Sequence, residues 1–109
     1  MLNKLLNRHL LHLIAFNKRS ITIQSEFDLV HQMKLLNNNK QFKETLELFD
    51  KHKEKNIDQF SNYILTQVLK ACSGLGDLQR GSNIHRLVSS RLKNDSFLLT
   101  SVIHLYSKF

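Results

Sequence analysis

An internal repeat constrains this sequence more than any other feature. From Glu26 onward the chain can be laid on itself, first with a shift of 36 residues and then with a shift of 34. The first shift aligns Phe27 with Tyr63, Leu29 with Leu65, Met33 with Leu69, Leu36 with Cys72, Phe42 with Leu78 and Leu48 with Ile84. The second aligns Tyr63 with Phe97, Thr66 with Thr100, Val68 with Val102, Leu69 with Ile103 and Cys72 with Tyr106. Periods of this length are typical of stacked helical pairs. The sequence therefore predicts an all-α fold, a right-handed solenoid of antiparallel helix pairs.

Each unit of the repeat has the pattern of two helices joined by a short elbow. In the second unit the apolar residues of the first helix recur at i, i+3, i+4 and i+7: Leu65, Val68, Leu69 and Cys72. Gly74 and Gly76 are expected to end that helix in the left-handed conformation, and Asp77 is expected to cap the next one. The inner stripe of that next helix is predicted to be Leu78, Gly81, Ile84, Leu87 and Val88. A phosphate-binding glycine loop would instead follow a strand, so "SGLGD" is predicted to be an elbow.

The repeat divides the chain into units. We predict a first repeat over 26–61, a second over 62–95 and an incomplete third over 96–109. Helical repeats bury their faces against neighbouring repeats, and about three are needed for stability. We therefore expect the sequence to be a fragment of a longer protein or the product of a truncated gene model.

The first 25 residues have the features of a targeting segment. An apolar stripe recurs at spacings of three and four: Leu2, Leu6, Leu10, Leu13 and Phe16. The segment is basic, contains no acidic residue and ends in hydroxyl side chains, which is typical of a mitochondrial transit peptide. A secretory signal fits less well, because the apolar stretch is short and interrupted by His12. The alternatives are an amphipathic helix that stays on the protein or one that lies on a membrane surface. The prediction is a mitochondrial protein whose transit peptide spans 1–25.

Charge and composition narrow the function classes. The chain carries 16 Lys and Arg against 9 Asp and Glu, a formal net charge of +7, which favours anionic partners. Its single cysteine, Cys72, excludes an internal disulfide and any four-ligand zinc site built from local motifs. Cys72 and His85 fall at packing positions of the repeat rather than forming a nucleophile and base. No apolar run approaches the roughly 20 residues that span a bilayer. We therefore expect no enzyme, no cofactor, no metal and no stable membrane insertion.

Two stretches of the repeat resemble a known family. "VLKACSGLGDLQRGSNIHRLV" and "DSFLLTSVIHLYSK" are similar to the pentatricopeptide repeat proteins, in particular the mixed long-and-short-repeat type of plant organelles. The resemblance covers about residues 26–109. It implies binding of single-stranded RNA, one base per repeat, within a factor for processing or modification of organellar RNA, including editing. Other RNA-processing proteins are implied as possible partners.

The resemblance also implies roles for individual residues. Base-reading positions fall on Val30, Thr66 and Thr100, and their partner positions on Ser61 and Asp95. Base-stacking positions fall on Phe27, Tyr63 and Phe97, and a phosphate-contacting lysine on Lys108. Val30 departs from the pattern because it has no polar atom. Thr66 with Asp95 suits a base edge that offers donors, which the family's usual code assigns to guanine.

Three alternatives remain open from the residues themselves. The three aromatic residues could be core or repeat-interface residues, and Asp95 could serve only as a helix cap. The repeats could also form a protein-interaction scaffold that binds a peptide rather than RNA. A membrane-surface protein held by residues 1–19 is a third possibility.

Overall fold

The computed structural model describes residues 18–52 and 56–109, with side chains from residue 26 onward. Within this part the regular elements are helices, which confirms the all-α prediction. They are α2 (Lys18–Asn38), α3 (Phe42–Asp50), α4 (Asn62–Leu75), α5 (Leu78–Val88) and α6 (Ser96–Ser107), with 3-10 turns η1 (Ile57–Gln59) and η2 (Ser89–Asn94). None of these described helices is both long enough and apolar enough to cross a membrane.

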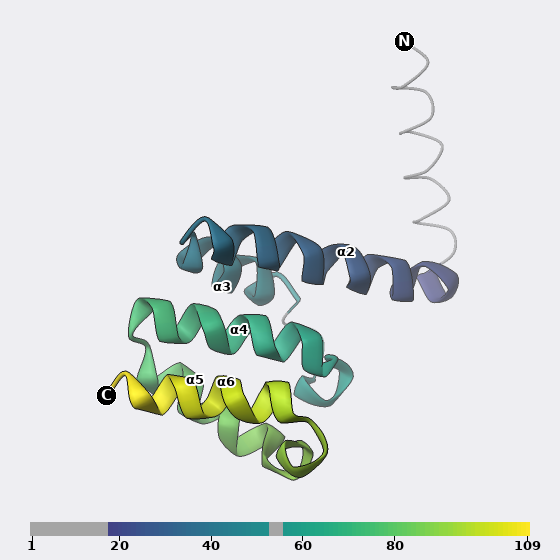
Figure 1. The fold of residues 1–109 in the computed structure, drawn as a ribbon. Helices are drawn as coiled ribbons and strands as arrows, with labels where there is room; N and C mark the ends of the chain where they lie inside the picture. Colours follow the sequence, from purple (N-terminus) through teal and green to yellow (C-terminus); the bar gives the residue numbers. More distant parts are fainter. Residues whose placement is uncertain (1–17, 53–55) are drawn as a thin grey trace.

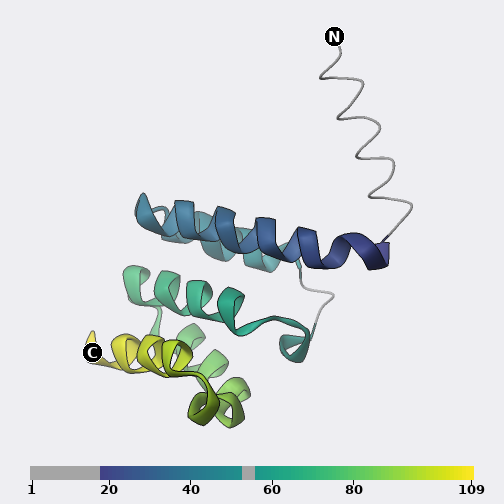
Figure 2. The same ribbon diagram turned by 45° about the vertical axis from the view of Figure 1, so that its right-hand side comes forward.

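The described helices form two layers. Figures 1 and 2 show α2, α4 and α6 stacked side by side with their amino ends on the same side, while α3 and α5 pack behind them. Helix α4 contacts α2, α3, α5 and α6. This arrangement is compatible with the predicted helical repeat. The right-handed solenoid itself stays a prediction, because the described helices span little more than two predicted units.

Capping residues in the elbow between α4 and α5 mark the end of one helix and the start of the next. Gly76 follows α4 with φ 73°, a left-handed conformation that often ends a helix and that glycine adopts with the least steric strain. The Asp77 carboxylate accepts a hydrogen bond from the Arg80 amide at 3.1 Å, so it caps α5 as predicted. Gly74 was predicted to share the role of Gly76, and this is wrong. Gly74 lies inside α4, where a Cβ atom would overlap the ring of Phe42.

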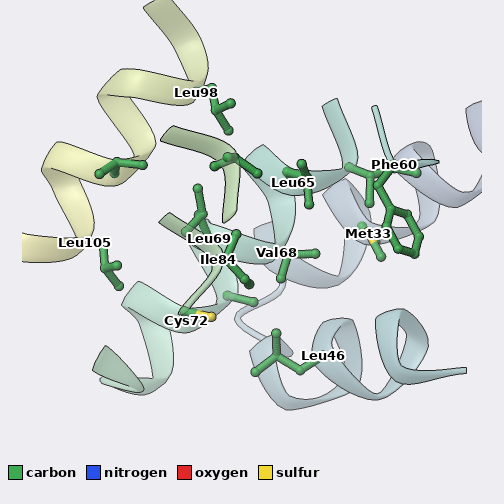
Figure 3. Close-up of a cluster of buried hydrophobic side chains, with 14 of the residues drawn as sticks. Met33, Leu46, Phe60, Leu65, Val68, Leu69, Cys72, Ile84, Leu98 and Leu105 are labelled. Carbon is green, nitrogen blue, oxygen red and sulfur yellow. The ribbon is translucent and has the colours of Figure 1, made fainter. Parts of the chain in front are cut away.

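The core extends across both layers and is centred on α4 (Figure 3). It comprises Leu29, Met33, Leu46, Phe60, Ile64, Leu65, Val68, Leu69, Ala71, Cys72, Ile84, Val88, Leu98, Val102 and Leu105. Gly81 of α5 lies so close to Leu105 of α6 that a side chain would overlap it, as expected for a close helix approach. Leu87 was predicted to face inward, but it is 60% exposed. It lies at the end of α5, just before the chain turns into η2.

A buried polar network joins the first predicted unit to the second. The Asn37 amide nitrogen donates to the backbone oxygen of Gln67 at 2.9 Å and to its side-chain oxygen at 3.0 Å. The Thr45 hydroxyl donates to the Asn37 side-chain oxygen at 2.8 Å. All three residues are buried. Because unpaired buried polar groups are costly, this network favours one register of α2 and α3 against α4.

The predicted unit boundaries fall near helix starts. Helix α4 begins at Asn62 and α6 begins at Ser96, the residues where the second and third units were predicted to start. Helix α2 begins at Lys18 and runs through the predicted boundary at residues 25 and 26. The transit peptide and the division into repeats stay predictions, and residues 1–17 lie outside the described part.

Candidate nucleic-acid interface

A groove between α4 and α6 brings together two of the predicted base-reading residues, Thr66 and Asp95. Its volume is about 380 Å³. It is lined by Lys34, Asn62, Tyr63, Thr66, Gln67, Lys70, Asp95 and Phe97. The predicted reading pair of the second repeat, Thr66 and Asp95, thus shares one groove with the predicted stacking residues Tyr63 and Phe97. We call it the reading groove.

The predicted stacking residues are exposed. The exposed fractions of Phe27, Tyr63 and Phe97 are 69%, 74% and 79%. Phe27 and Tyr63 line a neighbouring groove of about 500 Å³ between α2 and α4. The alternative that these aromatic residues form the core is therefore wrong. Tyr63 and Phe97 lie at the starts of α4 and α6, whereas Phe27 lies in the middle of α2. Exposed aromatic rings provide flat surfaces on which nucleic-acid bases can stack.

The threonine hydroxyls are already engaged as donors. Thr66 Oγ1 donates to the backbone oxygen of Asn62 at 2.7 Å, and Thr100 Oγ1 donates to that of Ser96 at 2.7 Å. A hydroxyl has one proton and two acceptor lone pairs. In this arrangement each threonine therefore presents its oxygen as an acceptor.

The carboxylate of Asp95 caps α6 and also faces the reading groove. Asp95 Oδ1 accepts from the amides of Phe97 and Leu98, both at 3.0 Å, and Oδ2 accepts from Asn62 Nδ2 at 2.9 Å. The hydrogen bond from the Leu98 amide, followed by that from the Asn62 side chain, lowers the pKa of Asp95 below its ordinary value. At neutral pH Asp95 is therefore a charged group that only accepts hydrogen bonds. Asp95 therefore caps α6, as the sequence had suggested it could, and also lines the reading groove.

The predicted reading pair of the first unit differs from that of the second. The side chain of Val30 packs against the core cluster and offers no polar atom. Ser61 caps α4, since its hydroxyl oxygen accepts from the Ile64 amide at 3.3 Å. The Ser61 amide in turn donates to Glu26 Oε1 at 3.1 Å. This pair does not reproduce the two acceptors of the reading groove.

Two lysines that the sequence analysis did not single out flank the reading groove. Lys34 reaches it from α2 and Lys70 from α4, and both side chains are exposed. Neither forms an ion pair with a residue in the described ranges, where the ion pairs are Arg80 with Asp50 and Arg91 with Asp58. The repeat could have identified both lysines, because the shift of 36 residues aligns Lys34 with Lys70.

A second groove continues from Lys70 toward the carboxyl ends of α4 and α6. Its volume is about 430 Å³, and its lining includes Lys70, Thr100, His104 and Lys108. The predicted reading residue Thr100 and the predicted phosphate contact Lys108 therefore lie here rather than in the reading groove. Two lysines and one histidine line this second groove, and no acidic residue lines it.

Acidic residues are unevenly distributed among the described helices, and those on the helices of the front layer, Glu26 and Asp28, lie on α2. Neither α4 nor α6 contains an aspartate or glutamate. In the layer behind them, α3 carries Glu44, Glu47 and Asp50, and Asp50 pairs with Arg80 of α5. The surface formed by α4 and α6 therefore has a positive balance of charge, which favours an anionic ligand.

The single cysteine does not contribute to this surface. Cys72 is fully buried in α4, and burial raises the pKa of its thiol to about 11. The thiol is therefore protonated at neutral pH, the less nucleophilic form. Among the residues that the structure describes, no three His, Cys, Asp or Glu side chains gather as metal ligands would.

Comparison with known proteins gives a partial relative. The chain is 48% identical over 44 residues to a pentatricopeptide repeat-containing protein of Arabidopsis thaliana. The match covers 39% of this chain and 6% of the relative's length. No protein-family model matches the chain, and no solved structure matches it. The match confirms the resemblance found in the sequence.

Proposed function

The chain is related to the pentatricopeptide repeat proteins, and on that premise we propose that it binds single-stranded RNA and reads a guanine in the reading groove. We place it in a factor for the processing or modification of organellar RNA. The observation that carries the proposal is the convergence of Thr66, Asp95, Tyr63 and Phe97 on one groove.

The preference for guanine follows from the acceptors in the groove. Thr66 presents its oxygen because its proton is donated to Asn62, and the Asp95 carboxylate only accepts. Guanine has two neighbouring donors on its Watson–Crick edge, at N1 and N2. Adenine, cytosine and uracil each have one donor group on this edge, and its neighbours there are acceptors. Protein side chains recognise unpaired RNA bases at these edges. Two acceptors facing one base therefore favour guanine.

Stacking and charge would supply the affinity that is independent of sequence. A base between Tyr63 and Phe97 can stack on either ring, which contributes about 1–3 kcal/mol per base. Lys34 and Lys70 flank the same groove and can neutralise the phosphates on either side of that base. Lys108, in the second groove, is placed to contact the strand further along.

Replacing Thr66 tests the base-reading role. We expect Thr66→Ala to lower the preference for guanine over adenine about tenfold, because one acceptor is lost. Affinity for an all-uridine strand should change little. The measurement is fluorescence anisotropy of the purified chain with uridine decamers that carry one central guanine or adenine.

Thr66→Ser is the matched control, since serine keeps the hydroxyl. It should retain most of the guanine preference. Equal affinities of the wild-type chain for both decamers would count against guanine reading. Absence of binding to any decamer would instead favour the protein-interaction scaffold.

The proposed location is the mitochondrion. This proposal depends on segment 1–25, which is basic, contains no acidic residue and is typical of a mitochondrial transit peptide. Because the chain spans 6% of the relative's length, we propose that recognition of a transcript uses further repeats or other RNA-processing proteins. Fusion of residues 1–25 to a fluorescent protein tests this location by microscopy.

A further inference from the structure

We propose that Asn62 and Arg91 are positioning residues that set the base preference of Asp95. Arg91 would hold the Asn62 side chain, and Asn62 would hold the Asp95 carboxylate. This inference rests on the proposed function, because Asp95 has a base preference only if the groove binds RNA. Neither residue was predicted from the sequence to take part in recognition.

Asn62 is the polar residue that links the two proposed reading residues. Its backbone oxygen accepts the Thr66 proton at 2.7 Å, and its side-chain Nδ2 donates to Asp95 Oδ2 at 2.9 Å. Asn62 is the first residue of α4, whereas Asp95 precedes α6. The bond between them therefore crosses from one predicted unit to the next at the edge of the reading groove.

The bond from Asn62 limits how Asp95 can meet a base. A carboxylate has about four acceptor sites on its two oxygens. Two on Oδ1 are taken by the amides of Phe97 and Leu98, and one on Oδ2 by Asn62. One site on Oδ2 is left, and its direction is set by the bond from Asn62. A single oriented acceptor discriminates between base edges better than a carboxylate that is free to turn.

Arg91 fixes the other end of the Asn62 amide. Its Nη1 donates to Asn62 Oδ1 at 3.1 Å and to the Phe60 backbone oxygen at 2.8 Å. Its Nη2 donates to the backbone oxygens of Asp58 at 3.2 Å and Ile57 at 3.4 Å. With Oδ1 facing the guanidinium, the Asn62 amide must present Nδ2 to Asp95. Lysine, which lacks the planar fork of arginine, cannot span these acceptors in the same way.

The experiment measures base preference separately from overall affinity. The full chain is titrated with uridine decamers that carry a central guanine, a central adenine or no substitution. We expect Asn62→Ala to reduce the guanine-over-adenine ratio from about tenfold to about twofold, a change of ratio that a uniform loss of affinity would not produce. Arg91→Ala and Arg91→Lys should lower the ratio in the same direction. Asn62→Asp should lose it too, because aspartate can accept from Arg91 but cannot donate to Asp95.

Controls separate positioning from folding and from charge. Arg86→Ala removes one positive charge from α5, where the Arg86 side chain is exposed, and should keep the wild-type ratio. Circular dichroism melting shows whether each variant is folded at the titration temperature. Asn62→Ala tests the inference even if Arg91→Ala unfolds, because the anchoring bonds of Arg91 to Phe60 and Asp58 remain.

The outcomes distinguish this inference from the proposed function. A wild-type guanine preference that Thr66→Ala abolishes and Asn62→Ala leaves unchanged would overturn the positioning role alone. Loss of affinity for every decamer at an unchanged ratio would also overturn it, because that result indicates a merely structural role. A wild-type chain without guanine preference would overturn the proposed base reading, and the positioning role with it.

Discussion

Replacing Leu69 by alanine is expected to lower the free energy of unfolding by about 2–5 kcal/mol. Leu69 is fully buried in α4, the helix that contacts all four other described α-helices. Truncation removes apolar area from the core and leaves a cavity that the surrounding helices fill only partly. A small domain has a stability of about 5–15 kcal/mol, so this variant should lose a large share of it. Urea unfolding followed by circular dichroism gives the measurement.

Leu87→Ala is the matched control for that variant. It is the same substitution at a leucine that is 60% exposed at the end of α5. Its effect should stay within about 0.5 kcal/mol, as is usual for surface positions. Equal destabilisation by the two variants would contradict the placement of α4 at the centre of the core.

Removing Lys34 and Lys70 together is expected to weaken binding to every RNA decamer and to reduce its salt dependence. Each phosphate neutralised on a single strand contributes about 0.7 to the slope of log affinity against log salt. Loss of two contacts should lower the magnitude of that slope by about 1.4, or about 25-fold in affinity over a tenfold range of salt. The guanine preference should persist, because Thr66 and Asp95 are untouched. Anisotropy titrations at several salt concentrations provide both quantities.

Lys43→Ala/Lys51→Ala removes the same charge from the opposite layer. Lys43 lies on α3 and Lys51 follows it, and both are exposed. If the RNA lies along α4 and α6, this variant should keep nearly the wild-type slope. Equal losses in the two double variants would mean that binding depends on net charge rather than on the grooves.

Most of the helices could be predicted from the sequence because their positions depend on local residue patterns. Apolar spacing predicted α4, and Gly76, Asp77 and Asp95 marked its end and the next helix starts. These features act within one or two turns of the chain, where residue type is most informative. The aromatic positions were ambiguous, because the repeat aligns Phe27, Tyr63 and Phe97 without showing which face of each helix is covered.

What could not be predicted depends on contacts between units. The role of Gly74 follows from the approach of Phe42, a residue 32 positions earlier in the chain. Arg91 reaches Asn62 across 29 positions, and Asn62 reaches Asp95 across 33. An arginine or asparagine has no fixed partner in a sequence pattern. Only the stacking of α4 against α6 and η2 brings these groups within hydrogen-bonding distance.

The most direct test of guanine recognition in the reading groove is an NMR titration of the ¹⁵N-labelled chain with the single-guanine decamer. The account predicts that the largest amide shift changes fall on Tyr63, Thr66, Lys70 and Phe97, and that they shrink with the single-adenine decamer. Changes confined to α3 and α5, or equal changes with both decamers, would contradict it.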